Sequence, residues 1–333
     1  MPQYAMLLWP HANVRYRAET LKLAMAELHI MLDGFCPEVE LSAGTHLGLP
    51  CIEIASETPL QHACIERVRT HSLLYGLYQR EGDLLLPIAG RESALLGEDL
   101  PGILKYKGKT NEIFTQMLLN IAWYSTEFKS PDATVCLLDP MCGRGTSLFL
   151  AVNRGWIATG SDLDKAGLRE GEQFFKRYLE YHRVKHSMSR GSLTADGRGA
   201  PYTQFEFSVS DQSGALRMVN LDAAGVRKAF GAERFHCVVC DLPYGVQHAS
   251  RGGSLESILK KALPAWRESL KPGGAIAVSY NAQTLPTERV REAMAQAGLE
   301  PRAGGAYDEC AHWVEQAVTR DVAVGVRGAK GRR

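Results

Sequence analysis

The sequence lacks any long apolar run, and its positive and negative charges almost cancel. No stretch of its 333 residues approaches the ~20 consecutive apolar residues that a membrane-spanning helix needs. The N-terminus, MPQYAMLLWPHANVRYRAE, has neither the basic start nor the small-residue cleavage site of a secretory signal. With 45% hydrophobic and 23% charged residues, the composition is typical of a folded, soluble protein. We therefore expect a cytoplasmic protein without a membrane segment.

Cysteine is present, but it forms no recognisable framework. The eight cysteines have no regular spacing, which is usual in a reducing compartment. Cys237 and Cys240 form the one C-x-x-C pair, and on a strand their side chains would point to opposite faces. We therefore expect neither a metal site nor a redox pair.

The formal net charge of +1 neither requires nor excludes nucleic acid as a partner. Positive charge gathers in KYKGK (Lys105, Lys107 and Lys109), in the run from Arg169 to Arg198, and in the C-terminal RGAKGRR. Such clusters suit an RNA-binding surface, and they also occur on ordinary solvated faces. Charge alone leaves both interpretations open.

The chain divides into regions with different patterns. In residues 1–100 the expected strands and helices follow the order of the βαββ core of a small ferredoxin-like α+β domain. This domain is a candidate for RNA binding. Residues 101–326 alternate strands with helices, which predicts an α/β domain with a parallel sheet. An insertion near 187–217 contains TADGRG, which is typical of a hairpin turn. We expect the basic tail, 327–333, to be disordered.

A glycine loop in LLDPMCGRGT is the first candidate binding element. An apolar strand runs into Asp139 and then into Gly143 and Gly145 before a helix. Glycines let the backbone approach a ligand closely, and the helix N-terminus favours a carboxylate or phosphate. The spacing differs from the dinucleotide G-x-G-x-x-G, and Asp162 ends the next strand where a ribose diol would lie. With the Asp139 carboxylate opposite the loop, these features suit S-adenosylmethionine (SAM).

The stretch VVCDLPYG is the second candidate element. A short apolar strand, Val238–Cys240, ends abruptly on Asp241, Leu242, Pro243 and Tyr244. In open α/β sheets, ligands bind at the carboxyl ends of the strands. The change from apolar to reactive residues at this strand end therefore predicts a catalytic site.

The two motifs together resemble those of the class I SAM-dependent methyltransferases that act on amino groups. The loop Asp139–Thr146 is similar to that family's D-P-x-C-G-x-G-T, and Asp241–Tyr244 is similar to its D/N/S-P-P-Y motif. The strongest resemblance is to the THUMP-associated tRNA guanosine-N2 methyltransferases, some of which carry Leu at the second motif position. It covers about Lys109–Val326 and implies a Rossmann-like seven-stranded sheet. The first hundred residues are too short for a full THUMP module.

The resemblance also assigns cofactor contacts. Asp139 and Gly143 would hold the methionine end of SAM, and Asp162 would hold the ribose. Asp222 would contact the adenine amino group, with Asp211 as the rival position. Thr110–Phe114 is placed like the family's additional cofactor segment, although TNEIF is also a typical capped helix start. The expected cofactor residues are Thr110, Asn111, Phe114, Asp139, Met141, Gly143, Gly145, Thr146, Asp162 and Asp222.

The catalytic motif fits the chemistry of a base amine. Such an amine is a poor nucleophile because its lone pair is delocalised, and two acceptors on its N–H groups can direct that lone pair toward a methyl donor. The resemblance assigns these acceptors to the Asp241 side chain and the Leu242 carbonyl. Pro243 would stiffen the turn, and Tyr244 would offer a stacking face to a flipped base. Aspartate can also take the released proton, which favours a nucleobase over a glutamine as the substrate.

We therefore predict a SAM-dependent RNA methyltransferase that modifies an exocyclic base amine, with guanine N2 in tRNA as the expected target. A DNA adenine or cytosine amino-methyltransferase is one alternative, which the ferredoxin-like N-terminus disfavours by analogy of fold. A catalytically silent RNA-binding subunit is another. The presence of both Asp139 and Asp241 argues against the silent subunit.

Overall fold

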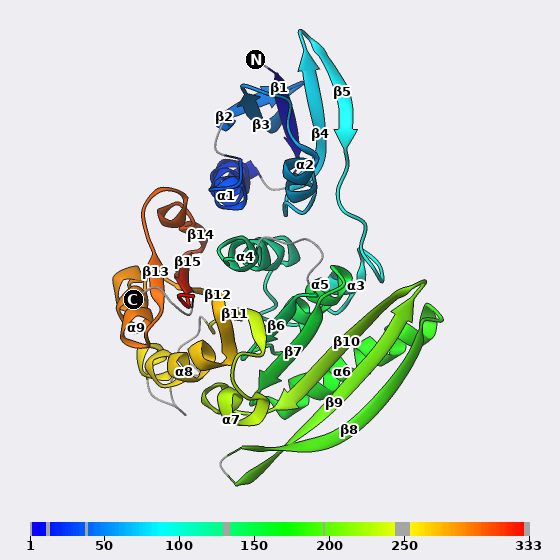
Figure 1. Cartoon of the computed structure of the whole chain (residues 1–333), viewed down its shortest axis with the longest axis vertical. Coiled ribbons are helices and arrows are strands. Elements are labelled where there is room, and N and C mark those ends of the chain that lie inside the picture. The colour runs from blue at the N-terminus through cyan, green and yellow to red at the C-terminus, as the bar shows by residue number, and fades with distance from the viewer. Residues whose placement is uncertain are drawn as a thin grey trace. The chain divides into compact units, whose positions relative to one another are not determined.

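The computed structural model describes residues 2–10, 14–36, 39–128, 134–195, 197–243 and 254–329. The chain forms two compact units: Met1–Ser93 with Ala303–Arg320, and Ala94–Arg302 with Asp321–Arg333 (Figure 1). The sequence placed the boundary at residue 100 and assigned residues 303–320 to the second region. The structure differs because residues 303–320 pack against the first long helix, where Lys22 pairs with Glu309 at 3.2 Å.

The first unit has the predicted ferredoxin-like topology. Its elements are β1 (Gln3–Leu8), α1 (Val14–Leu32), β2 (Val39–His46), β3 (Leu49–Ser56), α2 (His62–Arg69), β4 (Leu74–Glu81) and β5 (Leu84–Ala89). The strands form an antiparallel sheet in the order β2-β3-β1-β4-β5. The first four strands have the order of a βαββαβ domain, and β5 extends its edge. Both helices lie on the same side of this sheet (Figure 1).

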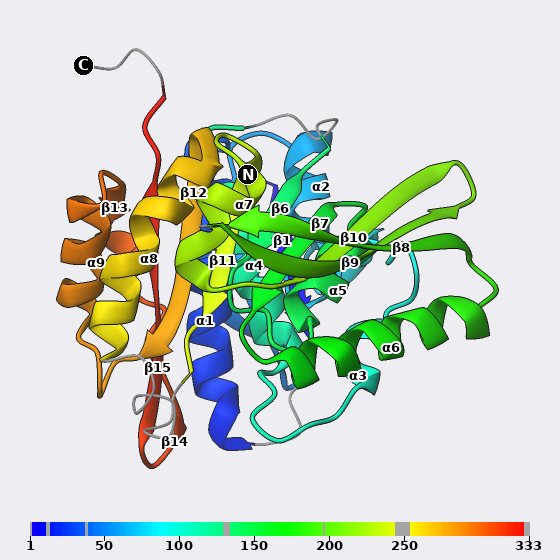
Figure 2. The same cartoon turned by 90° about the horizontal axis from the view of Figure 1, so that it is seen from below.

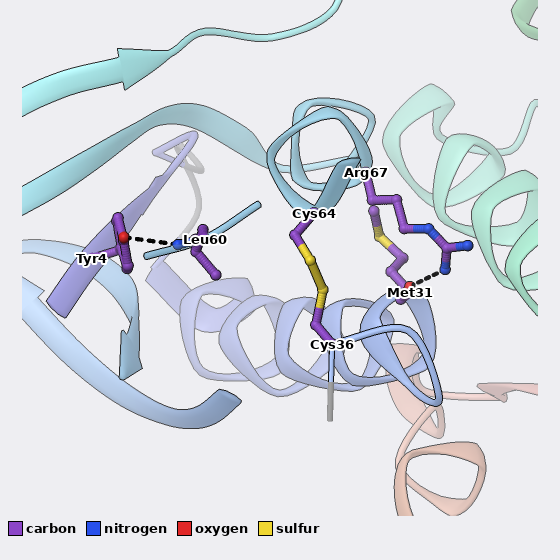
Figure 3. The surroundings of a disulfide bond; sticks show 6 residues. All are labelled: Tyr4, Met31, Cys36, Leu60, Cys64 and Arg67. Carbon is purple, nitrogen blue, oxygen red and sulfur yellow. Dashed lines mark hydrogen bonds between the residues drawn. A yellow bond between two sulfur atoms is a disulfide. The ribbon is translucent and has the colours of Figure 1, made fainter. Parts of the chain in front are cut away.

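A disulfide between Cys36 and Cys64 joins the turn that follows α1 to α2 (Figure 3). Arg67 reinforces the connection, because its Nη1 donates to the Met31 carbonyl at 2.8 Å and its guanidinium lies 3.5 Å from the Phe35 ring centroid. The cysteine spacing did not predict this pair. The partners are 28 positions apart, and only the packing of the two helices brings them together.

Reduction of this disulfide is expected to lower the stability of the first unit. A cross-link over a loop of this length stabilises a fold by about 2–4 kcal/mol, because it restricts the unfolded chain. Dithiothreitol should therefore lower the denaturation midpoint of the wild-type protein. The midpoint of a Cys36→Ser/Cys64→Ser variant should already be low and should not respond to the reductant. An equal response in both proteins would place the sensitivity at another cysteine.

The second unit is built on a sheet with a parallel centre. Its helices are α3 (Leu100–Ile103), α4 (Glu112–Tyr124), α5 (Thr146–Asn153), α6 (Lys165–Tyr181), α7 (Val226–Phe230), α8 (Leu255–Ser269) and α9 (Thr287–Gln296). Its strands are β6 (Cys136–Asp139), β7 (Ile157–Asp162), β8 (Lys185–Ala195), β9 (Arg198–Val209), β10 (Gln212–Asn220), β11 (Phe235–Asp241), β12 (Leu270–Asn281), β13 (Glu300–Arg302) and β15 (Val318–Val326), which enters from the first unit. The order is β13-β15-β12-β11-β6-β7-β10-β9-β8, and β14 (His312–Glu315) pairs with β15.

The predicted seven-stranded Rossmann-like sheet is present within this order. The strands β12, β11, β6, β7 and β10 are parallel neighbours, and β13 pairs antiparallel with β15 at one edge. Helices α4 and α5 pack together on one face, and α7, α8 and α9 pack together on the other (Figures 1 and 2). Cover on both faces explains why β11 is buried at every position before Asp241. None of the described helices is long and apolar enough to cross a membrane.

The insertion differs in extent from the prediction. The added element is the β8–β9 hairpin, in which Ala195 pairs with Arg198, so the hairpin predicted at TADGRG is confirmed. Residues from Gln212 onward belong to β10, a strand of the parallel sheet.

The tail also differs in part, because Arg327 is ordered. Its guanidinium donates to the Leu270 carbonyl and pairs with Glu233 at 3.0 Å. Residues 330–333 lie outside the described part of the chain.

Candidate cofactor and catalytic site

Four aspartates lie at the carboxyl ends of parallel strands. Asp139 ends β6, Asp162 ends β7, and Asp241 ends β11, while Asp222 follows β10 by two residues. Because these strands run in parallel, the four residues lie along one edge of the sheet. The rival Asp211 lies in the turn before β10, at the opposite edge. The topology therefore favours Asp222 over Asp211 as a neighbour of the glycine loop.

Asp162 supports the glycine loop directly. Its Oδ2 accepts a hydrogen bond from the Gly143 N–H at 2.8 Å, and its Oδ1 accepts one from the Asp164 N–H at 2.8 Å. Gly143 has a φ of 53°, and a side chain added there would meet no atom within 4 Å. The loop backbone is thus held from behind by Asp162 and borders open space in front. Asp164 caps α6.

Gly171 of α6 lets this helix approach the loop. A Cβ atom at this position would lie 2.4 Å from the Arg144 carbonyl oxygen, and a backbone atom cannot move aside as a flexible side chain can. The helix and the loop are therefore in close backbone contact. At Gly160 of β7 the close neighbours are side chains, and an added Cβ would lie 2.6 Å from the Cys142 sulfur.

Asp139 is a buried carboxyl group, only 5% exposed. The Ser147 hydroxyl donates to its Oδ2, and the Met141 N–H donates to its Oδ1 at 3.0 Å. Burial raises the pKa of Asp139 to about 7, and the carboxylates of Asp162 and Asp241 act in the same direction against these two hydrogen bonds. A cation would stabilise the ionised form of such a group. The site therefore suits the ammonium and sulfonium charges of SAM.

The segment before α4, which was predicted to contact the cofactor, also makes contacts within the protein. The Thr110 hydroxyl donates to Oδ2 of Asp241. The Asn111 side chain caps α4 by accepting from the Ile113 N–H at 2.8 Å. Phe114 is buried, with 7% of its surface exposed. The capped helix start is therefore confirmed, and Thr110 contacts the predicted catalytic motif.

The predicted catalytic motif, Asp241–Tyr244, begins at a strand that is anchored in the sheet. Asp241 is paired in register with Ser279 of β12, and the Leu242 N–H donates to the Ser279 carbonyl at 2.9 Å. The Leu242 side chain is 1% exposed and packs in the core, so leucine at the second motif position serves packing. Pro243 is half-buried, and Tyr244 lies outside the described residues.

Two residues near the glycine loop were missed by the sequence analysis. Ser147 follows the loop motif directly, and that position was the available signal. Tyr106 carries no comparable signal: its hydroxyl lies 3.2 Å from the Thr146 hydroxyl, and its ring lies 4.5 Å from the Arg144 guanidinium. Arg144 also pairs with Glu170 at 2.5 Å. Within the described ranges, no group of three or more His, Cys, Asp or Glu residues is placed to hold a metal ion.

Residues 126–303 match the family model described as RMKL-like, methyltransferase domain, which is more than half of the chain. The chain belongs to this methyltransferase family. The prediction of a SAM-dependent methyltransferase with a Rossmann-like sheet is thereby confirmed, and the acidic strand ends of this methyltransferase fit its cofactor. No curated protein sequence matches the chain significantly.

Several solved methyltransferase structures are also similar to this chain. One is a TehB-like SAM-dependent methyltransferase from Corynebacterium glutamicum, at 17% identity over 60% of this chain and 82% of that one, with a TM-score of 0.36. A Pyrococcus furiosus methyltransferase gives 14% identity, 68% and 88% coverage and a TM-score of 0.42. The precorrin-6y C5,15-methyltransferase of Geobacter metallireducens is 11% identical over 70% of this chain and 97% of that one, with a TM-score of 0.42.

Proposed function

We propose that this methyltransferase modifies an exocyclic amine of a nucleobase in RNA, and that guanine N2 of a cytoplasmic tRNA is its target. The observation that carries the proposal is the position of Asp241. It ends β11 beside β6, the strand that leads into the glycine loop, and its charge acts on Asp139. A carboxylate here can receive a base amine next to the bound cofactor.

Each acidic strand end has a role in this proposal. SAM supplies an electrophilic methyl group on its sulfonium. Asp139 pairs with the ammonium of the methionine end, Asp162 accepts hydrogen bonds from the ribose, and Asp222 accepts one from the adenine amino group. Met141, Gly143, Gly145 and Thr146 present the loop backbone to the cofactor.

Asp241 and Leu242 act on the substrate. The Asp241 carboxylate and the Leu242 carbonyl accept the two N–H groups of the base amine, which directs its lone pair toward the methyl group. Asp241 then takes the proton that the product releases. The role of Tyr244 as a stacking face for the flipped base is part of this proposal.

Two features support the preference for RNA: the fold of the first unit and the positive charge of the KYKGK segment. The ferredoxin-like unit supports it by analogy of fold. Lys105 and Lys107 are exposed and can meet phosphate groups. Lys109 is not available for this, because its side chain is only 8% exposed and its ammonium pairs with Glu112 at 2.5 Å.

Nucleoside mass spectrometry tests the substrate. Total tRNA, rRNA and DNA would each be incubated with the protein and methyl-labelled SAM, then digested and analysed. We expect label in N2-methylguanosine from tRNA. Label in N6-methyladenine or N4-methylcytosine from DNA would support the DNA alternative. Cofactor binding without label in any pool would support a silent RNA-binding subunit.

The affinity for SAM is expected to depend on pH through Asp139. Below its pKa of about 7 this carboxyl is protonated and cannot pair with a cation. Affinity should therefore rise as the pH increases from 6 to 8, by at most about tenfold per unit, and then level off. Calorimetry at several pH values would measure this. An Asp139→Asn variant should bind more weakly at pH 8 and show little pH dependence, whereas an unchanged slope would exclude Asp139 as the titrating group.

A further inference from the structure

Thr110 makes a contact that neither sequence motif reveals. Its hydroxyl donates a hydrogen bond to Oδ2 of Asp241, although 131 positions separate the two residues. Thr110 precedes the N-cap of α4, and Asp241 ends β11. Because α4 packs against β11 and β12, this bond connects the start of a helix to the catalytic end of a strand.

We propose that Thr110 is a positioning residue that sets the orientation of the Asp241 carboxylate for methyl transfer. The inference rests on the proposed role of Asp241. The last torsion of an aspartate side chain is broad, so a carboxylate at a strand end can rotate. A hydroxyl that holds Oδ2 restricts this rotation. The carboxylate is then aligned before the amine arrives, which lowers the cost of reaching a reactive geometry.

The backbone on both sides of Thr110 is fixed, so its hydroxyl is presented from a defined place. The Lys109 ammonium bonds to the Pro101 carbonyl at 2.6 Å and to Glu112 at 2.5 Å. On the other side, Asn111 caps α4. Thr110 therefore loses little conformational freedom when it bonds to Asp241, and the entropic cost of the bond is small.

The backbone of Asp241 is fixed in the same way. Its strand is paired in register with β12, and the next residue, Leu242, bonds to the Ser279 carbonyl at 2.9 Å. With both backbones anchored, the orientation of the Asp241 carboxylate depends on its side-chain torsions. The Thr110 hydroxyl acts on these torsions through its bond to Oδ2.

Isosteric substitution tests the proposal. Thr110→Val removes the hydroxyl and keeps the shape, and Thr110→Ser keeps the hydroxyl. Thr115→Val is the matched control, because Thr115 lies in the adjoining helix α4 and its hydroxyl donates to the Asn111 carbonyl at 3.1 Å. In the full-length protein with labelled SAM and total tRNA, Thr110→Val should lower kcat by roughly 10- to 100-fold. Its KM and its calorimetric affinity for SAM should stay near the wild-type values, and Thr110→Ser and Thr115→Val should stay close to wild type.

A double-mutant cycle tests the bond without relying on a substrate. Thr110→Val should lower the denaturation midpoint of the wild-type protein more than that of an Asp241→Ala protein, because the second has no carboxylate to bond. Equal shifts in the two backgrounds would overturn the proposed contact. This comparison holds for any substrate.

The remaining outcomes separate this inference from the proposed function. If Thr110→Val reacts at the wild-type rate while Asp241→Ala is inactive, the positioning role is wrong and the proposed function stands. If Thr110→Val loses affinity for SAM, Thr110 is a cofactor ligand and the inference is overturned. If Asp241→Ala itself reacts at the wild-type rate, the proposed catalytic role fails, and the positioning role fails with it.

Discussion

Asp241→Ala is expected to leave SAM affinity nearly intact while the rate of methyl transfer falls by something on the order of 10²–10⁴. In the proposed mechanism the carboxylate acts on the substrate amine, so its loss raises the energy of the transition state more than that of the cofactor complex. Single-turnover assays with labelled SAM would measure the rate, and calorimetry would measure the affinity. The two quantities must separate for Asp241 to be catalytic.

Asp241→Asn serves as the control for this prediction. The amide keeps an oxygen acceptor but has little capacity to take a proton. The methyl-transfer rate of Asp241→Asn should therefore lie between those of Asp241→Ala and the wild type. Wild-type turnover in Asp241→Ala would show that β11 simply ends in a turn and that the reaction depends on other groups.

Asp162→Ala is expected to cause the largest loss of cofactor affinity. A hydrogen bond to a charged group contributes roughly 1.5–3 kcal/mol, so the loss of the ribose contact should weaken binding by about 10- to 150-fold. The structure adds a second effect, because Asp162 also holds the Gly143 N–H at 2.8 Å. Without this support, the loop backbone becomes less well ordered for the ligand.

Asp162→Asn separates the two effects. The amide oxygen can accept from one backbone N–H, but the bidentate acceptor is lost. Calorimetry should place its affinity between those of the wild type and Asp162→Ala. If Asp162→Ala binds SAM as tightly as the wild type does, neither the ribose contact nor the support of the loop is correct.

The sequence predicted the sheet and its acidic edge well, for a physical reason. Buried parallel strands are continuous apolar runs, and the residue types change sharply where each run ends. Asp139 and Asp241 stand at such changes, so their strand ends could be located without the structure, whereas Asp162 follows Thr159, Gly160 and Ser161 and was placed by its position at the end of the next strand after the glycine loop. The ferredoxin-like order of the first unit was predictable from the alternation of its strands and helices.

Contacts between distant positions were not predictable in this way. The bond from Thr110 to Asp241 and the disulfide from Cys36 to Cys64 depend on how helices pack, and no periodic pattern reports that. Lys109 was grouped with exposed lysines because a charge run looks the same whether its members face solvent or an ion pair. Asp211 and Asp222 could be separated only when the direction of β10 was known.

The division of the first unit between two parts of the chain has a consequence for synthesis. Residues 303–320 belong to this unit, yet they are made after most of the second unit. On the ribosome, β1–β5 and the two helices can form early, but the surface of α1 that contacts residues 303–320 stays uncovered until those residues have been synthesised. A deletion of the first hundred residues would likewise leave residues 303–320 without α1. Truncated proteins would therefore report on an incomplete fold as well as on a missing domain.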